Sequence, residues 1–262
     1  MKYIKDRVKA GEVLFGVFVN LGSPLTTEIL GLAGYDWALI DLEHGAGDEG
    51  NVLTQIQAVE HTPVVPLVRI ESTSRPRFHR VLDFGAAGIM VPRVDSVEQA
   101  KEAVAGLHYP PEGTRGVAQM NRACMFGGAF NEYLAAAEDQ LLGIIQIEST
   151  AGVRQAGEIA ELKGVDVLFV GPTDLSYSMG ILGQLEHPAF VEAVTTVAAA
   201  AKGAGKACGI LLRNPEETKR FLSLGYTFLG CGSDASLLRV AAQGQLTALR
   251  EQAATARACL DF

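Results

Sequence analysis

Three short polar segments stand directly after hydrophobic runs and contain residue types that could carry out chemistry. They are residues 41–45 (Asp-Leu-Glu-His-Gly), 146–149 (Gln-Ile-Glu-Ser) and 171–175 (Gly-Pro-Thr-Asp-Leu). Each preceding run is typical of a buried strand, so parallel strands would bring all three segments to one edge of the sheet, where α/β enzymes have their active sites. A histidine, two carboxylates and an amide that meet there indicate a metal-assisted acid/base site.

Glu148 and Asp174 are the candidate metal ligands. Either acid alone could cap a helix or lie in a solvated loop. However, they follow the predicted fifth and sixth strands, and neighbouring strands lie about 5 Å apart, so the two carboxylates would face each other across a gap that suits Mg²⁺ or Mn²⁺. Without a metal, their repulsion would raise one pKa, and a pair of acids sharing a proton is the alternative interpretation.

His44 is the candidate histidine of the acid/base site, and Arg69 is the candidate anion-binding group. His44 follows the predicted second strand, three residues after Asp41 and next to Glu43, in a turn that contains glycine. Arg69 ends the predicted third strand, where its guanidinium could hold a carboxylate and neutralise an enolate oxygen. A structural ion pair with Glu43 or Asp41 is the other interpretation of Arg69, and the two roles are compatible.

Gln146 and Asp83 are the remaining candidates. Gln146 stands two residues before Glu148, so the alternation of a strand places both side chains inside the barrel, where a buried amide needs hydrogen-bond partners. Asp83 lies in the segment Leu-Asp-Phe-Gly, and on spacing alone it is predicted to cap a turn.

Eight hydrophobic runs of strand length alternate with helical segments. Most are continuously hydrophobic, which is typical of parallel strands that are covered on both faces. Together with a length of 262 residues and a hydrophobic content of 48%, this pattern predicts one domain over residues 1–262, an α/β fold of the (β/α)8 TIM barrel class. The predicted strands are 14–19, 37–42, 64–70, 88–91, 142–147, 167–170, 208–212 and 227–229.

Amphipathic stretches between these strands predict helices over residues 24–33, 51–60, 96–107, 152–160, 188–204 and 215–224. The interval 108–128 interrupts the alternation and is rich in Pro, Gly, Arg and Met. A connection of that length is usually functional or part of an interface. Residues 237–260 are rich in alanine and strongly helical, and this helix could either close the barrel or extend to another subunit.

Composition excludes several classes of function. The net charge of −8 and the absence of a block of Lys or Arg argue against a nucleic-acid partner. No stretch reaches the roughly 18 apolar residues of a membrane span, so we expect no membrane association and a cytoplasmic protein. The four cysteines are far apart, without a Cys-x-x-Cys pair, and are interpreted as reduced thiols.

The positions of the lysines argue against imine chemistry. An aldolase that forms a Schiff base needs a desolvated lysine on a barrel strand. The lysines before residue 10 precede the predicted barrel, and those from Lys101 onward fall on predicted helices or their flanking turns. No Gly-rich phosphate loop follows a strand either, which argues against nucleotide chemistry.

The complete set of motifs resembles one family. It comprises Gly-Tyr-Asp-Trp at 34–37, Asp-x-Glu-His at 41–44, Val-Arg at 68–69, Gly-Ala-x-Gly-Ile-Met-Val-Pro at 85–92, Tyr-Pro-Pro-x-Gly-x-Arg-Gly at 109–116, Gln-x-Glu at 146–148 and Gly-Pro-x-Asp-Leu-Ser at 171–176. In this order the motifs resemble the HpcH/HpaI family of class II pyruvate aldolases. The likeness covers almost the whole chain, and the set is highly specific although each motif alone is weak.

The resemblance implies a role for each candidate residue. It implies a TIM barrel, usually a hexamer of the dimer-of-trimers type with exchanged C-terminal helices. Glu148 and Asp174 match the ligands of a divalent metal, Mg²⁺ or Mn²⁺, and His44 matches the general base. Arg69 matches the residue that stabilises the enolate. Gln146 and Thr173 fall in segments that contact pyruvate, as Asp174 does.

The resemblance also changes the interpretation of Asp83. This residue matches an acid that a neighbouring subunit supplies to raise the basicity of the histidine, which replaces the turn-capping role. The implied reaction is the reversible cleavage of 4-hydroxy-2-oxo acids to pyruvate, formed as its enolate, and an aldehyde. Two alternatives stay open: a carbon–carbon lyase similar to citrate lyase or malyl-CoA lyase, and a non-catalytic barrel that acts as a binding protein.

The connection 108–128 is a candidate for recognition of the aldehyde. The residues above hold only the pyruvate half, so the aldehyde must be bound by groups that overhang the site. Arg115 and Arg122 could bind anionic or hydroxylated tails. A structural connection stabilised by arginine ion pairs is an equally good interpretation.

We predict that borohydride added together with pyruvate will neither inactivate the protein nor label it, because no lysine is predicted inside the barrel. Mass spectrometry of the intact chain after the treatment measures this directly. A pyruvyl-lysine adduct at a single site would refute the class II interpretation.

Overall fold

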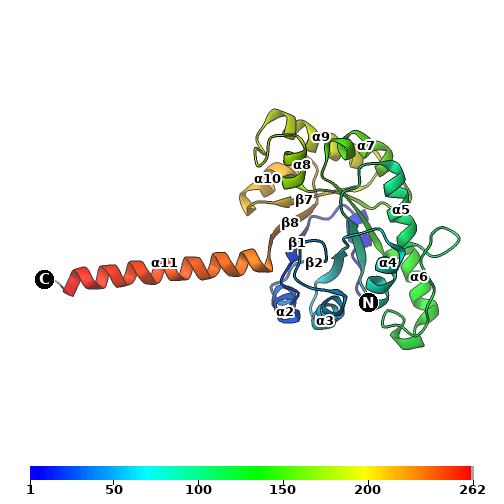
Figure 1. The fold of residues 1–262 in the computed structure, drawn as a ribbon, viewed down its shortest axis with the longest axis horizontal. Coiled ribbons are helices and arrows are strands. Elements are labelled where there is room, and N and C mark those ends of the chain that lie inside the picture. Colours follow the sequence, from blue (N-terminus) through cyan, green and yellow to red (C-terminus); the bar gives the residue numbers. More distant parts are fainter. Residues whose placement is uncertain (261–262) are drawn as a thin grey trace.

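Eight parallel strands form a closed barrel in this computed structural model, which describes residues 1–260, with side chains through residue 257 (Figure 1). The strands pair in chain order, and β8 pairs with β1 to close the barrel. The predicted fold class is confirmed, and each predicted strand is present with shifts of a few residues at the ends. The strands are β1 (Leu14–Val19), β2 (Trp37–Asp41), β3 (Val65–Arg69), β4 (Gly88–Val91), β5 (Leu142–Ile147), β6 (Val167–Val170), β7 (Ala207–Leu212) and β8 (Phe228–Ser233).

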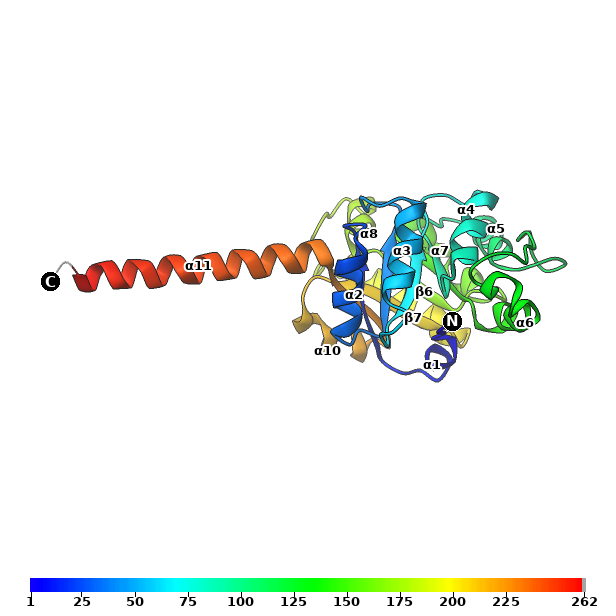
Figure 2. The same cartoon turned by 90° about the horizontal axis from the view of Figure 1, so that it is seen from below.

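Helices cover the outside of the barrel (Figures 1 and 2). The predicted helices are present as α2 (Pro24–Leu32), α3 (Glu49–Ala58), α5 (Val97–Leu107), α7 (Thr150–Ala160), α9 (Pro188–Gly203), and the pair η2 (Pro215–Glu217) and α10 (Thr218–Ser223). Further elements were not predicted: α1 (Lys5–Lys9), α4 (Arg75–Phe84), η1 (Met125–Gly127), α6 (Phe130–Gln140) and α8 (Pro172–Ser178).

Helix α4 shows why such elements escape prediction. Its sequence is RPRFHRVLDF, and its buried side chains are Phe78, Val81 and Leu82. The three arginines and the histidine dilute the hydrophobic pattern, although these three apolar residues share one face at helical spacing. Proline in the first turn and a left-handed Gly85 after Phe84 are ordinary signals for the start and end of a helix.

The barrel interior follows the two-residue alternation of the strands. Trp37, the single tryptophan of the sequence, stacks on Phe228 with a centroid distance of 4.4 Å, and Phe18 and Phe169 pack around this pair. Farther along the strands, the inward positions change from apolar to polar. Leu39 is followed two residues later by Asp41, Leu67 by Arg69, and Ile144 by Gln146. The same alternation that fills the barrel therefore directs polar side chains into its carboxyl end.

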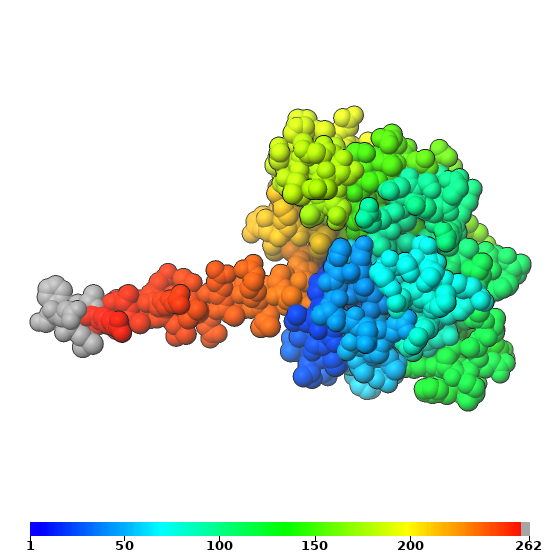
Figure 3. Space-filling model, in the orientation of Figure 1, coloured from blue at the N-terminus to red at the C-terminus, as the bar shows by residue number. Residues whose placement is uncertain are grey.

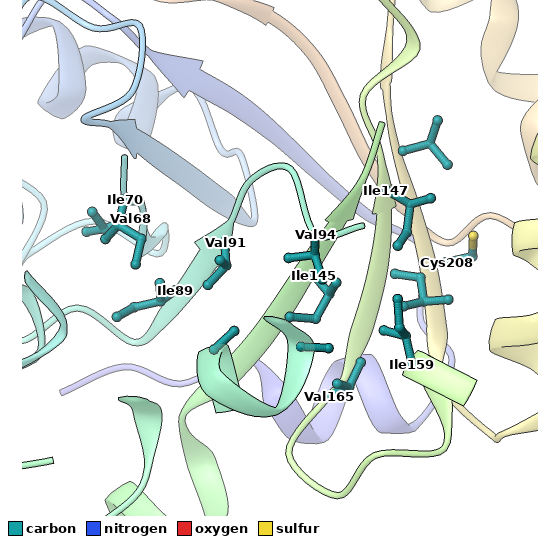
Figure 4. Packing of buried hydrophobic residues seen from close by; sticks show 14 of the residues in the cluster. Val68, Ile70, Ile89, Val91, Val94, Ile145, Ile147, Ile159, Val165 and Cys208 are labelled. Atoms are coloured by element: carbon teal, nitrogen blue, oxygen red, sulfur yellow. The ribbon is translucent and has the colours of Figure 1, made fainter. Parts of the chain in front are cut away.

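Outward-facing strand residues form a separate apolar layer against the helices. Val68, Ile89, Val91, Ile145 and Ile147 belong to this cluster and are almost completely buried (Figure 4). Each strand therefore has one face buried inside the barrel and the other buried against the helices, which explains why its sequence is almost continuously hydrophobic.

The amino end of the barrel is closed by α1. Lys5 forms an ion pair with Asp166 at 2.9 Å and donates a hydrogen bond to the carbonyl oxygen of Leu141 at 3.0 Å. Both partners of this ion pair are buried. The polar carboxyl end is therefore the end at which a ligand can enter.

Helix α11 (Asp234–Leu260) extends away from the barrel as an isolated rod (Figures 1–3). Its first residue is anchored, because the Asp234 carboxylate accepts hydrogen bonds from the backbone of Asn20 at 2.8 Å and from Thr26 Oγ1 at 2.8 Å. The barrel closes through β8 and β1 without this helix, which rules out the first of the two alternatives for residues 237–260. Leu238 and Leu249 are among its exposed apolar residues.

None of the helices in residues 1–260 has both the length and the apolar character needed to cross a membrane.

Candidate active site

A cavity of about 540 Å³ opens at the carboxyl end of the strands. Five of the predicted site residues line it together: His44, Arg69, Gln146, Thr173 and Asp174. They come from the ends of β2, β3 and β5 and from the first turn of α8, as the parallel arrangement predicted. Other lining residues include Phe18, Asn20, Asp41, Gly171, Arg213 and Ser233.

Arg69 and Asp41 form a two-pronged ion pair at the base of this cavity. The residues are direct neighbours in the register of β2 and β3. Nε of Arg69 donates to Asp41 Oδ1 at 2.9 Å, and Nη2 donates to Oδ2 at 2.7 Å. Both side chains are buried, so each needs the charge of the other. The structural ion pair that the sequence left as one interpretation of Arg69 is present.

The remaining nitrogen of Arg69, Nη1, is directed toward the other polar residues. It lies 3.4 Å from Gln146 Oε1 and 3.1 Å from Glu43 Oε2. The contact with Glu43 lacks the alignment of a hydrogen bond. One edge of the guanidinium is thus used for structure, and Nη1 is the nitrogen that can bind a ligand.

Asp41 also determines the turn that contains His44. Burial alone would raise the pKa of Asp41, but the hydrogen bonds and charge of Arg69 outweigh this effect and lower it. Oδ1 accepts from the backbone N–H groups of Glu43 and His44 at 3.1 Å and 3.3 Å. A Cβ at Gly45 would lie 2.1 Å from the carbonyl oxygen of Asp41, so this turn needs glycine.

His44 itself is open to solvent, with a side chain that is 67% exposed. Its Nε2 lies 3.9 Å from Glu43 Oε2. Burial raises the pKa of Glu43, opposed by the charges of Arg69 and His44. The imidazole therefore stands at the entrance of the cavity, where it can exchange protons with a ligand or with water.

Glu148 is buried beside Gln146. Its Oε2 accepts from Gln146 Nε2 at 2.6 Å, and its Oε1 accepts from the backbone N–H of Arg93 at 2.8 Å. Arg93 has a φ of +53°, a left-handed conformation that is uncommon outside glycine. Burial, together with the charges of Glu43 and Asp174, raises the pKa of Glu148 to about 7.

Glu148 and Asp174 fit a hard divalent cation. Their carboxylate oxygens are the donors that Mg²⁺ and Mn²⁺ prefer. The pKa of Glu148 is raised first by burial and then by the charges of Glu43 and Asp174, and a bound cation would offset these effects. Gly171 is required beside Glu148, because a Cβ there would lie 2.6 Å from Glu148 Oε2. Asp174 is exposed at the start of α8 and is accessible from the cavity.

Asp83 is not part of this cavity in its own chain. It lies in the last turn of α4, the helix that returns from the carboxyl end of β3 to the amino end of β4. His44 is at the opposite end of the strands, so the two residues cannot meet within one chain. The Asp83 carboxylate instead pairs with Arg115 at 2.9 Å.

The connection 108–128 does not overhang the cavity of its own barrel. It follows α5, and therefore begins at the amino end of the strands. Arg115 is completely buried, and Arg122 donates to the carbonyl oxygen of Phe84 at 3.0 Å and to Glu60 at 3.1 Å. The prediction that Arg115 contacts an aldehyde is wrong, since no ligand reaches a fully buried side chain. The structural interpretation of both arginines is the one that the contacts support.

Comparison with known proteins agrees with the geometry. The family model described as "HpcH/HpaI aldolase/citrate lyase" matches residues 14–241. A curated relative from Salmonella arizonae, named 5-keto-4-deoxy-D-glucarate aldolase, is 40% identical over 239 residues, which cover 91% of this chain and 93% of the relative. The chain belongs to the HpcH/HpaI aldolase/citrate lyase family.

Two solved structures have the same fold. A family protein from Burkholderia cenocepacia superimposes with a TM-score of 0.90 at 38% identity, covering 94% of this chain and 98% of that protein. A structure described as citrate synthase SbnG has a TM-score of 0.86 at 26% identity, covering 96% and 98%. This HpcH/HpaI member is accordingly an enzyme, a carbon–carbon lyase of the aldolase type, and the predicted function is confirmed at that level. The non-catalytic alternative is set aside.

Several residues of this HpcH/HpaI site were not predicted. Asn20 donates from Nδ2 to Asp41 Oδ2 at 2.7 Å, and it occupies the inward position two residues after Phe18. Gly171 stands in the same relation to Phe169. The alternation of β1 and β6 could have identified both residues. Arg93 carries no such signal, because its backbone N–H, and not its side chain, binds Glu148.

We predict that the metal-free protein loses stability as pH rises from about 4.5 to 7 through Glu148. Its folded-state pKa lies above its unfolded value, so the folded state binds more protons in this window, and the free energy of unfolding falls with rising pH. The difference between the wild type and Glu148→Gln should change by up to about 3 kcal/mol across the window.

Urea unfolding in EDTA, followed through the emission of Trp37, measures this difference. Glu158→Gln, which removes an exposed acid from α7, is the matched control and should run parallel to the wild type. Parallel curves for Glu148→Gln as well would mean that Glu148 is not held at a raised pKa.

Proposed function

We propose that this protein is a cytoplasmic, single-domain, metal-dependent aldolase that cleaves 4-hydroxy-2-oxo acids to pyruvate and an aldehyde, and that also runs in reverse. The observation that carries the proposal is the row of inward polar side chains at the carboxyl end of the barrel. Asp41, Arg69, Gln146 and Glu148 follow the apolar interior of three strands and are joined by hydrogen bonds. Such a set suits a small, planar, anionic ligand next to a cation.

The pyruvate half of the substrate is held by this row. Nη1 of Arg69 is not used by the ion pair with Asp41, and it carries two hydrogens, of which one bonds to Gln146. The other can be donated to an oxygen of the 2-oxo acid. Gln146 is polarised between Arg69 and Glu148, and Thr173 adds an exposed hydroxyl at the cavity wall. Arg69 is thus preorganised to stabilise negative charge that develops on the keto oxygen.

Glu148 and Asp174 would hold the divalent metal, Mg²⁺ or Mn²⁺. When bound, the cation acts as a Lewis acid that polarises the 2-oxo acid and lowers the cost of negative charge on its oxygen. Gln146 and the backbone N–H of Arg93 fix the Glu148 carboxylate by one hydrogen bond to each of its oxygens. Asp41, in contrast, is occupied by Arg69 and Asn20 and serves as an orienting group.

His44 takes the proton from the C4 hydroxyl, directly or through a water molecule. As this O–H bond breaks, its electron pair forms the carbonyl of the aldehyde, and the C3–C4 pair becomes the double bond of the enolate of pyruvate. Arg69 donates to the enolate oxygen as the charge develops. Protonation at C3 then gives pyruvate.

The oligomer completes the site in this proposal. We assign Asp83 to the His44 of a neighbouring subunit, because the ends of the barrel separate the two residues within one chain. A hexamer with exchanged C-terminal helices would bring the two together. The isolated α11 and its exposed leucines support such an assembly, since apolar residues on an unpacked helix favour burial against another chain.

The substrate class can be tested by coupling pyruvate release to lactate dehydrogenase over a panel of 4-hydroxy-2-oxo acids, with 5-keto-4-deoxy-D-glucarate included because relatives bear that name. Dialysis against EDTA should abolish the release, and Mg²⁺ or Mn²⁺ should restore it. Glu148→Gln and Asp174→Asn should each lower kcat by more than about 100-fold, because even residues behind metal ligands contribute about 10–100-fold.

Glu158→Gln on the outer face of α7 is the matched control and should retain full activity. Full activity after removal of the metal would contradict the metal assignment. Formation of citrate from oxaloacetate and acetyl-CoA, without pyruvate release from any 4-hydroxy-2-oxo acid, would favour the citrate-type alternative.

A further inference from the structure

Asp83 and Arg115 are the centre of a hydrogen-bonded network that is remote from the cavity of its own chain. Nη2 of Arg115 donates to Asp83 Oδ1 at 2.9 Å and to the hydroxyl of Tyr133 at 2.8 Å. The Tyr133 hydroxyl donates in turn to the carbonyl oxygen of Leu82 at 3.3 Å. The network therefore ties Asp83 to the backbone of the residue that precedes it.

Arg115 is an unusual side chain because a whole guanidinium is buried. It has no exposed surface, and its guanidinium lies over the rings of Tyr109 at 4.5 Å and Tyr133 at 5.2 Å. Nε and Nη1 have no hydrogen-bond partner among the described residues. A buried cation is strongly unfavourable unless it is paired, so Arg115 requires a carboxylate beside it and constrains the position of Asp83.

The loop that carries Arg115 is fixed to α4, the helix of Asp83. Arg75 Nε donates to the carbonyl oxygen of Thr114 at 2.6 Å, and the backbone N–H of Gly116 donates to His79 Nε2 at 2.9 Å. The backbone N–H of Arg115 also donates a hydrogen bond, to the carbonyl oxygen of His108 at 2.9 Å. The backbone is therefore held at Arg115 and at the residues on both sides of it. Helix and loop form one rigid support for the carboxylate.

The second oxygen of Asp83 is left for another use. Within residues 1–260 no hydrogen-bond donor contacts Oδ2, and the Asp83 side chain is 20% exposed. The carboxylate is thus held by one oxygen from inside the protein while the other is available at the surface. This is the arrangement of an acid that orients a group outside its own chain.

We infer that Arg115 is a positioning residue for catalysis in the neighbouring subunit: it holds Asp83 so that Oδ2 meets the His44 imidazole there. The inference rests on the proposed function, in which Asp83 acts across the interface, and adds the group that makes Asp83 effective. Arg115 touches neither substrate nor metal. Its contribution reaches the reaction through Asp83.

Three variants separate the effects of the charge of Arg115, the shape of its guanidinium and its hydrogen bond to Tyr133. Arg115→Met should lower kcat for aldol cleavage by about 10–100-fold, the usual effect of a residue that orients a catalytic group. KM should stay within about 2-fold, because Arg69 and Gln146 in the pyruvate half are unchanged. Arg115→Lys, which keeps the charge, and Tyr133→Phe, which removes one acceptor, should give intermediate losses. Arg80→Met is the control: Arg80 lies on α4, is mostly exposed and pairs with Glu49.

Subunit mixing distinguishes positioning across the interface from a general structural role. In a 1:1 mixture of His44→Ala and Asp83→Asn subunits, about a quarter of the sites combine an intact histidine with an intact acid. Asp83→Asn keeps an acceptor for Arg115. A mixture of Arg115→Met with His44→Ala should recover activity in the same way, whereas a mixture of Arg115→Met with Asp83→Asn should not, because both variants damage the same side of the interface.

The outcomes separate the inference from the proposal beneath it. Native mass spectrometry first demonstrates subunit exchange. Recovery of activity when Arg115→Met is mixed with His44→Ala, but not when it is mixed with Asp83→Asn, then supports the inference. Near-wild-type activity of Arg115→Met overturns it, and so does the absence of recovery with His44→Ala under conditions where the His44→Ala and Asp83→Asn pair recovers. If that reference pair itself fails, the assignment of Asp83 to the neighbouring subunit is refuted, and the inference falls with it. A wild type without aldolase activity would refute the proposed function directly.

Discussion

The ion pair between Arg69 and Asp41 is the interaction on which the rest of the site depends. A guanidinium that points into the barrel cannot remain unpaired, and the register of β2 and β3 places a carboxylate directly beside it. Because Asp41 also accepts from the backbone N–H groups of Glu43 and His44, the same carboxylate fixes the turn that carries the histidine. The pair leaves Nη1 of Arg69 unused by Asp41, so one interaction aligns the proposed anion-binding group with the proposed base.

The ion pair also makes Asp41 differ from Glu148 in its pKa. Asp41 has a lowered pKa because the bonds from Arg69 outweigh its burial, whereas burial and two neighbouring carboxylates raise the pKa of Glu148 to about 7. One carboxylate is thus saturated by a fixed cation, and the other lacks one. A bound divalent cation would suit Glu148, because it would supply the positive charge that Arg69 supplies to Asp41. A site prepared in this way would select a ligand that brings its own oxygen donors, as a 2-oxo acid does.

The sequence predicts those features that follow from local periodicity. Continuous hydrophobic runs predicted all eight strands, and the alternation within β5 correctly joined Gln146 and Glu148 on one face. The same rule applied to β1 and β6 would have identified Asn20 and Gly171. Features that depend on contacts between distant elements could not be predicted. The burial of Arg115 requires Tyr133 and α4, and the support of Glu148 by Arg93 requires a left-handed backbone conformation that nothing in the local sequence demands. The position of Asp83 relative to His44 depends on the end of the barrel at which each residue lies. Within one chain, Asp83 lies at the amino end and His44 at the carboxyl end.

The central claim is that Glu148 and Asp174 hold a divalent cation against the oxygens of a 2-oxo acid while Arg69 binds the same ligand. Crystals soaked with Mn²⁺ and pyruvate, and measured for the anomalous scattering of manganese, test this claim most directly. The account predicts one anomalous peak in each chain between the two carboxylates, with pyruvate bound to the metal and in contact with Nη1 of Arg69. A peak elsewhere in the chain, or pyruvate bound at Arg69 with no metal beside Glu148, would contradict it.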